Sequence, residues 1–499
     1  MTLLDLLKNT EDITIPANTD LTHEINAICH DSRKAREDSL FVCIKGAIDD
    51  GHLYARSAYE RGCRLFVAER PLPEVPEDAT VMLCPDSRMA LASLSARFFD
   101  NPADELCIIG ITGTKGKTST ALMIYNILNE CDLCCGYIGS NGIDYRSFHG
   151  ETPNTTPESY TLHMFMREMV NVGVKYLVME VSSQALFLHR VHGIPFDICL
   201  FTNLSEDHIG TYEHPDFEHY KNCKKSLFCD YGAKTLIYNA DDDYGTEMMS
   251  VAPADARIIS YATETSSDYR ATKASLYRKP DSLGVNFSYL SEGQPYEVTL
   301  NFPGKFSVYN ALAAIAVCRE CGLSPEEIAE KLRNVHIKGR FEMVRALPYA
   351  TFIIDYAHNR VSLTSALETL RLYNPSRLIC LFGSVGGRTQ GRRVELGSVA
   401  ASLADFCILT SDNPDREDPE AILDDIASQF RFGGCPYVRI SDRAEAIRYA
   451  ASIAQEGDIF LFAGKGHEDY QLIFGEKRPF SERDILLEAV RELAEEQKI

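Results

Sequence analysis

Short, almost continuously apolar runs recur along this chain, and they constrain its fold more than any other feature. They lie at 107–112, 176–180, 198–203, 235–240, 351–357, 378–383, 406–411 and 459–464. Longer stretches with helical periodicity separate them, such as TSTALMIYNILNEC at 118–131. Runs that are apolar on both faces are typical of parallel strands covered by helices. The alternation therefore predicts βαβ units and doubly wound α/β sheets.

The length of the chain predicts more than one domain. A chain of 499 residues is too long for one hydrophobic core and suggests about three domains. We expect a small α/β domain at 1–86, a central domain at 87–338 and a C-terminal domain at 339–499. A polar, turn-rich stretch at 262–305 predicts antiparallel strands inserted into the central domain. The segment HIKGRFEMV resembles a hinge in which Gly339 supplies freedom between domains.

The chain is strongly acidic, with a formal net charge of −22. This charge argues against a nucleic-acid partner, because a phosphate backbone would be repelled. No run of eighteen apolar residues occurs, so no membrane insertion is expected. The start, MTLLDLLKNTEDITIP, carries acids and lacks the basic head and cleavage site of a signal peptide. We therefore expect a cytoplasmic protein.

Sixteen cysteines raise the alternatives of disulfides or a metal site. Two Cys-x-x-Cys pairs occur, one at Cys131 and Cys134 and the other at Cys318 and Cys321. They are far apart in the sequence, and their spacing fits no zinc ribbon or finger. Most of the others lie inside apolar runs, where cysteine behaves as a small hydrophobic residue. Free thiols in a reducing compartment are therefore the favoured interpretation.

A glycine-rich loop follows the first of the apolar runs. The stretch GITGTKGKTSTA ends a strand, turns tightly and begins a helix, and backbone N–H groups at a helix start suit a polyphosphate. The usual spacing would place a glycine where Ile111 stands, so the pattern is the shorter one from Gly113 to Thr118. A turn without a ligand is the alternative, but the strand–loop–helix context favours a nucleotide. The predicted phosphate-loop residues are Gly113, Thr114, Lys115, Gly116, Lys117, Thr118 and Ser119.

Polar residues that could serve this loop follow two further runs. Within the loop itself, Lys117 is expected to reach the terminal phosphates and Thr118 to bind magnesium. Glu180 ends the second run, where a carboxylate could hold a metal or cap the next helix. Asp207 and His208 follow the third run, although a lone histidine there is more often a structural hydrogen bonder than a metal ligand.

Several short motifs occur together in a characteristic order. They are TGTKGKTS, MEVSS, TNLSEDH, GRFE, DYAHN and AGKGHEDYQ, and the chain also contains DSRKAREDSLFVCIKGAIDDGH and NTTPES. Over nearly its full length the chain resembles the Mur ligase family, and within it the members that add the third amino acid of the peptidoglycan stem. The resemblance implies a three-domain α/β fold. It consists of a small N-terminal domain, a central P-loop ATPase-like doubly wound sheet and a C-terminal Rossmann-like domain.

The resemblance also implies a reaction. ATP would phosphorylate the D-glutamyl side-chain carboxylate of UDP-N-acetylmuramoyl-L-alanyl-D-glutamate. The amino group of a diamino acid would attack the resulting acyl phosphate and release phosphate. Two Mg²⁺ ions and Lys117 would neutralise charge around the γ-phosphate. The protein is expected to act as a monomer in peptidoglycan precursor synthesis, and so in cell shape and cell division.

The family pattern assigns roles to further residues. Contacts to the UDP-muramoyl-dipeptide are expected at Ser32, Asn154, Thr155, Thr156, Ser182 and Arg190. Groups on the magnesium side are expected at Thr118, Glu180, His208 and Lys224. Nucleotide contacts are expected at Asn310, Arg340 and His358. One departure is Gln184, which stands where many members have histidine and can still donate a hydrogen bond.

Lys224 aligns with the lysine that family members carbamylate. A carbamate turns an ammonium into an anionic oxygen ligand for magnesium. The alternative is a solvated lysine on a basic helix face. Lys221 and Lys225 are close enough in sequence to take the assignment if the register shifted.

The stretch SDNPDREDPEAI bears on which amino acid is added. In relatives that add meso-diaminopimelate, an arginine stands where this chain has Asp415. An acid would repel a distal carboxylate and attract the distal ammonium of L-lysine or L-ornithine, which favours L-lysine over meso-diaminopimelate. Arg416 follows and could replace the missing arginine, while Asp418 has the pattern of a helix N-cap. The amino-acid pocket is expected to use Arg388, Asp412, Asn413, Pro414, Asp415, Gly464 and Glu468.

Two other classes of function stay open at this point. Folylpolyglutamate-type synthases and other amide ligases use a similar central domain, but the N-terminal DSR and KGAIDDGH segments favour a UDP-sugar substrate. A non-enzymatic scaffold is disfavoured because the loop, both strand-end groups and Lys224 are all present.

Overall fold

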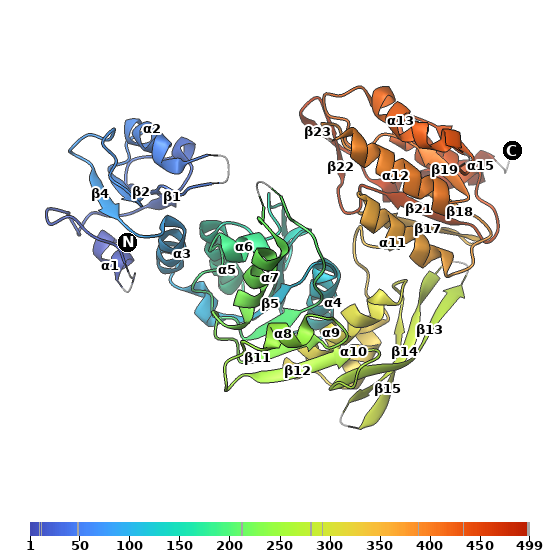
Figure 1. Cartoon of the computed structure of the whole chain (residues 1–499), viewed down its shortest axis with the longest axis horizontal. Helices are drawn as coiled ribbons and strands as arrows, with labels where there is room; N and C mark the ends of the chain where they lie inside the picture. The colour runs from blue at the N-terminus through green and yellow to red at the C-terminus, as the bar shows by residue number, and fades with distance from the viewer. Residues whose placement is uncertain are drawn as a thin grey trace. The chain divides into compact units, whose positions relative to one another are not determined.

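The computed structural model describes residues 1–8, 10, 12–46, 49–210, 213–279, 282–291, 293–387, 389–432 and 434–496. The chain divides into two compact units. The first comprises Met1–Arg270 with Leu312–Leu323, and the second comprises Ala271–Ala311 with Ser324–Ile499. Sheets of mainly parallel strands with helices between them confirm the predicted α/β class (Figure 1). No helix among the described residues is both long and apolar enough to cross a membrane.

The first unit begins with a small parallel sheet, whose four strands follow the order β1-β2-β3-β4. The strands are β1 (Ala27–Cys29), β2 (Ser39–Val42), β3 (Leu65–Ala68) and β4 (Thr80–Leu83). The helical elements are α1 (Leu3–Leu7), η1 (Ser32–Lys34), η2 (Gly51–Tyr54), α2 (Ala55–Glu60), α3 (Ser87–Phe98) and η3 (Pro102–Glu105). Successive side chains of a strand point to opposite faces, so Leu40 and Val42 enter one buried cluster and Phe41 another. Both faces of this sheet are therefore covered.

The larger sheet of the first unit has the strand order β12-β11-β10-β5-β9-β6-β7-β8. Its strands are β5 (Cys107–Thr112), β6 (Cys135–Gly139), β7 (Gly142–Tyr145), β8 (Phe148–Gly150), β9 (Tyr176–Glu180), β10 (Ile198–Phe201), β11 (Thr235–Asn239) and β12 (Arg257–Ala262). Its helices are α4 (Lys117–Glu130), α5 (Ser159–Asn171), α6 (Ser183–Phe187), α7 (Phe217–Lys225), η4 (Ser226–Phe228) and α8 (Gly245–Met249). All neighbouring strands pair in parallel except β6-β7 and β7-β8.

The position of β5 decides where a ligand would bind. β5 pairs with β10 on one side and β9 on the other. The chain continues from β5 to β6 beyond β9, and only later reaches β10 on the opposite side. Open α/β sheets bind ligands at such a switch point, beyond the carboxyl ends of the strands. The phosphate loop follows β5, and Glu180 ends β9, so both lie at this edge.

The second unit combines an antiparallel meander with a mostly parallel sheet. The meander is β13 (Tyr269–Lys279), β14 (Ser282–Ser291) and β15 (Gln294–Leu300). It is followed by α9 (Phe306–Glu320), whose residues from Leu312 onward belong to the first unit, and by α10 (Pro325–Leu332). The six-stranded sheet has the order β16-β17-β21-β18-β19-β20, and a separate hairpin joins β22 to β23. The strands of the six-stranded sheet are β16 (Glu342–Leu347), β17 (Ala350–Asp355), β18 (Leu378–Phe382), β19 (Phe406–Leu409), β20 (Tyr437–Arg439) and β21 (Ile459–Ala463). The hairpin consists of β22 (Tyr470–Ile473) and β23 (Glu476–Pro479). The further helices of this unit are α11 (Arg360–Arg371), α12 (Gln390–Leu403), α13 (Pro419–Ala427), η5 (Ser428–Phe432), α14 (Arg443–Ser452) and α15 (Glu482–Glu496).

The eight apolar runs all form strands, and several end earlier than predicted. The run at 198–203 ends as a strand at Phe201, and the run at 406–411 ends at Leu409. The residues cut off after Phe201 and Leu409 are polar and belong to loops at the carboxyl edge. Asp418 caps α13, because its side chain accepts the Glu420 N–H.

The predicted antiparallel insertion is present, with contacts that the sequence did not reveal. The Tyr373 hydroxyl donates to the Gly284 carbonyl at 3.0 Å, and the Arg278 guanidinium donates to carbonyl oxygens of Tyr373, Asn374 and Gly457. The meander therefore belongs to the same compact unit as the C-terminal sheet.

Gly339, predicted as a hinge residue, makes a close backbone contact in this structure. Its φ is +71°, and an added Cβ would lie 2.0 Å from the His467 nitrogen. Its carbonyl also accepts the Tyr356 N–H at 3.0 Å. A close backbone approach and a left-handed conformation therefore require glycine here, and the hinge role stays a prediction.

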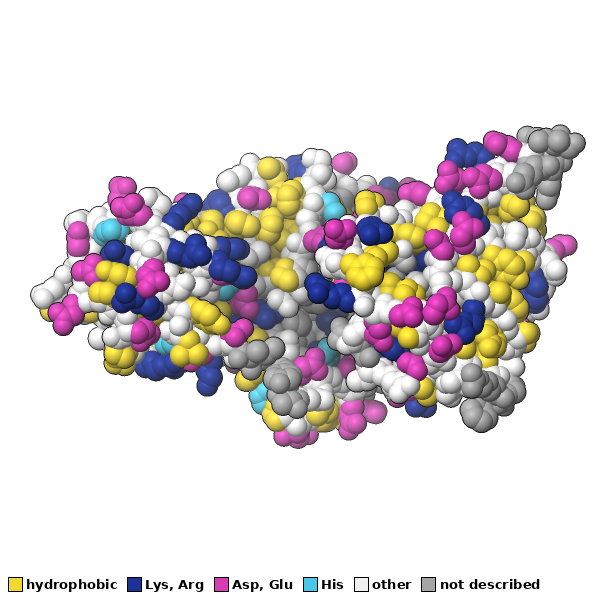
Figure 2. All heavy atoms as spheres, turned by 90° about the horizontal axis from the view of Figure 1, so that it is seen from above, with side chains coloured by type: hydrophobic (Ala, Val, Ile, Leu, Met, Phe, Trp, Pro, Cys, Tyr) yellow, Lys and Arg dark blue, Asp and Glu magenta, His cyan; other side chains and the backbone are white. Residues whose placement is uncertain are grey.

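The charged surface and the cysteines can be compared with the composition. Figure 2 shows acidic side chains scattered over the visible face, and a group of Lys and Arg side chains on the left of the view. The cysteines of the described ranges form no disulfide with one another.

Candidate active site

The phosphate loop is shaped by two glycines that no other residue could replace without strain. Gly113 has a φ of +148°, and an added Cβ would lie 2.0 Å from Thr202 Oγ1 and 3.0 Å from the Asn203 carbonyl oxygen. Gly116 has a φ of +83° and forms the N-cap of α4. The backbone N–H groups at the start of α4 are therefore presented at the carboxyl edge of β5, as an anion site requires.

We expect Gly113→Ala to lower the free energy of unfolding by about 2–4 kcal/mol, because the methyl group overlaps Thr202 in addition to the backbone strain. The measurement is equilibrium urea unfolding. Gly193→Ala is the matched control, since Gly193 has a φ of +75° but no atom within 4 Å of an added Cβ; strain alone should cost about 1–2 kcal/mol. Equal losses for the two variants would contradict the steric argument.

Residues that follow β10 form hydrogen bonds with the phosphate loop. The Thr114 N–H donates to the Asn203 carbonyl at 2.8 Å, and the Lys115 N–H donates to Asn203 Oδ1 at 2.9 Å. The Thr114 hydroxyl lies 3.1 Å from the Tyr220 hydroxyl of α7. The loop conformation is thus held by β10 and α7 as well as by its own glycines.

Two lysine amines meet at one carbonyl of the loop. Lys117 Nζ donates to the carbonyl oxygens of Gly113 at 2.7 Å and Thr114 at 3.1 Å. Lys224 Nζ donates to the same Gly113 oxygen at 2.9 Å. Lys224 is buried, and its burial, with the neighbouring Lys117 charge, holds the pKa of its amine well below the usual range. The alternative of a solvated surface lysine is therefore wrong.

Glu180 is fully buried at the end of β9 and accepts several hydrogen bonds. Its Oε1 accepts from the Tyr137 hydroxyl at 2.7 Å and the Ser140 N–H at 2.8 Å. Its Oε2 accepts from the Thr118 hydroxyl at 3.0 Å. The Glu180 side chain therefore does not cap the next helix. Ser182 caps that helix, since its hydroxyl accepts the Ala185 N–H.

Several predicted substrate residues form one connected network beside Glu180. The Thr156 hydroxyl donates to the Glu180 carbonyl oxygen at 2.8 Å and accepts the Ser182 N–H at 3.1 Å. Arg190 donates to the Thr156 carbonyl at 3.1 Å and to Glu158 Oε1 at 2.9 Å. Glu158 was not singled out from the sequence; it also pairs with Arg88 at 3.4 Å.

Other predicted substrate residues lie at the edge of this network or outside it. The Thr155 hydroxyl lies 3.0 Å from the Ser140 hydroxyl, whereas Asn154 is exposed and its carbonyl accepts from Thr152. Ser32 begins the short η1 helix, capped by Asp31. Ser119 is buried in the first turn of α4.

His208 lies apart from the Glu180 network. Its side chain is 48% exposed, and its Nδ1 lies 3.1 Å from Glu213 Oε1. Its φ is +56°. Within the described part of the chain, no hydrogen bond links it to Glu180 or Thr118.

In the second unit, a buried polar cluster gathers at the carboxyl edge of β19 and β21. Lys465 Nζ donates to Asn413 Oδ1 at 2.7 Å and to Glu468 Oε2 at 2.9 Å, and lies 3.9 Å from Asp412 Oδ1. Asn413 Nδ2 donates to the same Glu468 oxygen at 2.9 Å. Lys465 was missed from the sequence, although a lysine between two glycines after a strand was the available signal. Gly464 is required because an added Cβ would lie 2.7 Å from Asp412 Oδ2.

Two of the predicted nucleotide residues of this unit, Arg340 and His358, contact Tyr356. The Arg340 guanidinium lies 5.1 Å from the Tyr356 ring centroid, and His358 Nδ1 lies 2.7 Å from the Tyr356 carbonyl oxygen. Burial lowers the pKa of His358 and lowers that of His467 to about 4. Asn310 is buried within α9.

Comparison with known proteins decides the family. Family profiles match residues 24–99 (Mur ligase family, catalytic domain), 111–318 (Mur ligase middle domain) and 339–466 (Mur ligase, glutamate ligase domain). A UDP-N-acetylmuramoyl-L-alanyl-D-glutamate–2,6-diaminopimelate ligase of Caldanaerobacter subterraneus is 41% identical over 494 residues, covering 99% of both chains. The chain belongs to the Mur ligase family.

Further relatives indicate which kind of Mur ligase this chain is similar to. A protein of the same name from Clostridium botulinum is 38% identical and covers 99% of this chain and 100% of its own length. The structure of another ligase of that name covers 99% of both chains at 27% identity, with a TM-score of 0.71. This Mur ligase thus has the three-domain α/β architecture and is an ATP-dependent ligase that adds the third residue in peptidoglycan synthesis. The relatives name 2,6-diaminopimelate, so the preference for L-lysine is not supported.

The structure gives Asp415 of this Mur ligase a contact that the sequence did not reveal. Its Oδ1 accepts the Gly475 N–H at 2.7 Å, and its N–H donates to the Leu472 carbonyl at 2.9 Å. The carboxylate therefore holds the turn of the β22–β23 hairpin. Its neighbour Arg416 is exposed. Pro414 packs closely, since an added Cβ at Gly386 would meet its carbonyl oxygen at 2.0 Å. Arg388 lies outside the described residues.

Proposed function

We propose that this Mur ligase joins 2,6-diaminopimelate to the D-glutamyl side-chain carboxylate of UDP-N-acetylmuramoyl-L-alanyl-D-glutamate, through an acyl phosphate formed with ATP. The observation that carries the choice of amino acid is the shared name of relatives aligned over 99% of this chain. The Asp415 carboxylate also accepts a hydrogen bond from the hairpin. Its charge is therefore weaker support for a basic amino acid than its position in the motif suggested.

The phosphate loop is proposed to bind the ATP phosphates. The start of α4 offers N–H groups, and Lys117 holds its ammonium over the Gly113 and Thr114 carbonyls, 2.7 and 3.1 Å away. A cation held there would counter charge on the phosphoryl group as it is transferred. Nucleotide contacts are also proposed for Thr114, Lys115, Gly116, Ser119, Asn310, Arg340 and His358.

Thr118 and Glu180 are proposed to hold Mg²⁺, and His208 is proposed as a further magnesium-binding group, although in the described residues it hydrogen-bonds to Glu213 rather than to these two. The side-chain oxygen atoms of Thr118 and Glu180 lie 3.0 Å apart, and hydroxyl and carboxylate oxygens are the ligands that Mg²⁺ prefers. Bound Mg²⁺ would neutralise phosphate charge, and we propose two ions. The hydrogen bonds from Tyr137 and Ser140 fix the Glu180 carboxylate in place.

Lys224 is proposed to carry a carbamate. Carbon dioxide reacts with a neutral amine, and burial beside Lys117 favours the neutral form of Lys224. The modified side chain would place anionic oxygens beside the loop, where Lys117 supplies the positive partner. Lys221 and Lys225 instead pair with Glu247 at 3.1 and 3.7 Å, which argues against the shifted register.

The dipeptide is proposed to bind residues of the first unit, and the amino acid is proposed to bind residues of the second unit. Ser32, Asn154, Thr155, Thr156, Ser182 and Arg190 are proposed as contacts to the UDP-muramoyl-dipeptide. Arg388, Asp412, Asn413, Pro414, Gly464 and Glu468 are proposed as the amino-acid pocket. Within it, Arg416 is proposed to bind the distal carboxylate of 2,6-diaminopimelate, because a guanidinium matches a carboxylate with two parallel bonds.

The decisive experiment measures phosphate release from ATP with the UDP-muramoyl-dipeptide and each of 2,6-diaminopimelate, L-lysine and L-ornithine. We expect the highest kcat/KM with 2,6-diaminopimelate. A higher value with L-lysine would overturn the choice of amino acid alone. Release that is independent of the dipeptide would overturn the proposed reaction.

Arg416→Ala is expected to raise the KM for 2,6-diaminopimelate by about 10–100-fold and to leave the KM for ATP unchanged, because one charged hydrogen-bonding partner is lost. The measurement is steady-state kinetics with the amino acid varied. Arg478→Ala is the matched control, since Arg478 is an exposed arginine on β23 of the adjacent hairpin. An unchanged KM in Arg416→Ala would assign the distal carboxylate to another group.

A further inference from the structure

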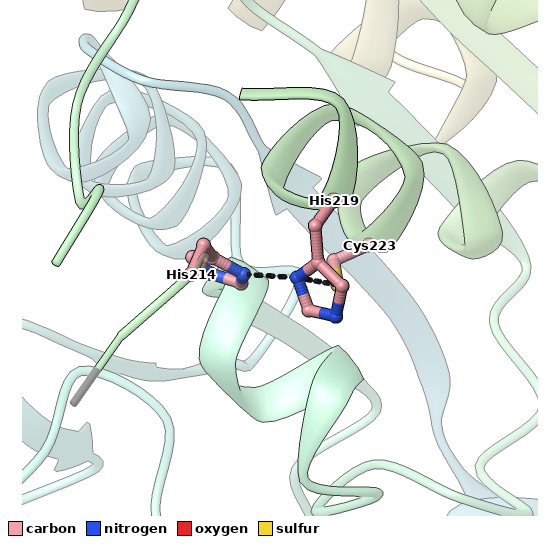
Figure 3. Close-up of side chains that lie close together, drawn as sticks. All are labelled: His214, His219 and Cys223. Carbon is pink, nitrogen blue, oxygen red and sulfur yellow. Dashed lines mark hydrogen bonds between the residues drawn. The ribbon is translucent and has the colours of Figure 1, made fainter. Parts of the chain in front are cut away.

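Three potential metal ligands converge beside α7, in a place that the proposed reaction does not use. His219 and Cys223 are four residues apart on α7, so they share one helix face. His214 reaches them from the preceding loop (Figure 3). One ligand atom from each residue lies within 4.8 Å of the others.

The separations of the ligand atoms suit a transition metal. His214 Nδ1 lies 2.9 Å from His219 Nδ1, and Cys223 Sγ lies 3.6 Å from the same nitrogen. Zinc binds imidazole nitrogen at about 2.0–2.1 Å and thiolate sulfur at about 2.3 Å in a tetrahedron. Those bond lengths put neighbouring ligand atoms about 3.3–3.6 Å apart. The three ligand atoms lie within 4.8 Å of one another, so an ion could be accommodated by adjustment of the side chains.

A simple hydrogen-bond chain accounts for the same contacts less well. His219 Nδ1 faces both His214 Nδ1 and Cys223 Sγ, yet one ring nitrogen offers either one hydrogen or one lone pair. It can therefore serve only one of the two contacts fully. A cation at the centre would use the lone pairs of all three ligand atoms at once.

The surroundings resemble the outer shell of a metal site. His214 Nε2 lies 2.9 Å from the Ser183 hydroxyl, which can accept from Nε2–H in the tautomer that leaves the Nδ1 lone pair available, as outer hydrogen bonds of metal-binding histidines do. His214 is fully buried. The Phe187 ring lies 4.8 Å from the His219 ring, and the Tyr220 ring lies 5.3 Å from the His214 ring.

We propose that His214, His219 and Cys223 bind one zinc-class transition-metal ion, with solvent as the fourth ligand. Two imidazoles and a thiolate select such a metal over Mg²⁺, which prefers oxygen ligands. The site is therefore chemically distinct from the one at Thr118 and Glu180.

The ion would stabilise the structure around the phosphate loop. It ties the loop that carries His214 to α7, and α7 also carries Tyr220 and Lys224. Those two side chains contact Thr114 and Gly113 of the phosphate loop. The proposed role is therefore structural, and it does not depend on which amino acid the enzyme adds.

The test uses the full-length protein, loaded with Zn²⁺ and passed over a desalting column, with metal content measured by mass spectrometry. We expect about one Zn²⁺ per chain. Titration with Co²⁺ should give the intense visible bands of a tetrahedral site and a near-ultraviolet thiolate band. His219→Gln and Cys223→Ser should each weaken binding by more than about 100-fold. His219 and Cys223 are chosen because they are only partly buried, unlike His214.

Matched controls separate this site from adventitious binding. Cys229→Ser removes the exposed cysteine just beyond α7, and His189→Gln removes a partly exposed histidine; both should bind like the unaltered protein. Circular dichroism of the metal-free variants checks that they fold. No bound Zn²⁺ in the folded protein, or equal loss in Cys229→Ser and Cys223→Ser, would overturn the proposal.

Discussion

Lys224→Ala is expected to lower kcat by about 10²–10³-fold, comparable to the loss of one preorganised charged group at a reacting centre. Lys224 is buried against the phosphate loop, and its Nζ lies 2.9 Å from the Gly113 carbonyl oxygen. If the side chain carries a carbamate, the variant loses an anion that only this position supplies. Formate added at high concentration should restore part of the activity, because it can enter the space left by the side chain.

The controls for this prediction are the neighbouring lysines. Lys225→Ala removes an amine that pairs with Glu247 at 3.7 Å, and it should retain nearly full activity. Thermal unfolding of Lys224→Ala, measured alongside kcat, tests whether the loss comes from misfolding. Full activity of Lys224→Ala in bicarbonate-free buffer would refute the carbamate.

Glu180→Gln is expected to lower kcat by about 10²–10³-fold and to raise the Mg²⁺ concentration needed for half-maximal rate. Glutamine has the same shape but no charge, so it can accept from Tyr137 and Ser140 as Glu180 does. What it loses is the anionic oxygen that faces the Thr118 hydroxyl. The measurement is kcat as a function of Mg²⁺ concentration.

A similar bond elsewhere in the same sheet region provides the control. The Tyr145 hydroxyl donates to Glu168 Oε2 at 2.6 Å, so Glu168→Gln makes the same chemical change away from the phosphate loop. It should leave kcat and the Mg²⁺ dependence unchanged. A wild-type Mg²⁺ dependence in Glu180→Gln would remove Glu180 from the metal site.

The fold and the phosphate loop were accessible from the sequence because their signals are local. An apolar run long enough for one strand, followed by a helical pattern, needs no knowledge of distant residues. The glycines at 113 and 116 could be found for the same reason, since their backbone geometry follows from their own lack of a Cβ. The predicted strand ends were less accurate, because the residues after Phe201 and Leu409 leave the sheet and form loops.

The roles of individual side chains were less accessible. The fourth residue of the Asp-Asn-Pro turn was interpreted by its charge alone, but Asp415 is bonded to Gly475, sixty residues away in the sequence. Lys465 belongs to the buried polar cluster that follows β19 and β21 only through its contacts with Asn413 and Glu468. No pattern in the sequence linked His214 to Cys223, because a loop residue and a helix face meet only after folding.

The sequence by itself determined the order of strands and helices, the phosphate loop and the family of this protein. The tertiary structure decided that Lys224 is buried beside Lys117, that Asp415 hydrogen-bonds to a hairpin, and that two histidines and a cysteine lie close together. The physical reason is that backbone conformation depends mainly on neighbouring residues, whereas the charge state and partners of a side chain depend on burial by residues far away in the chain.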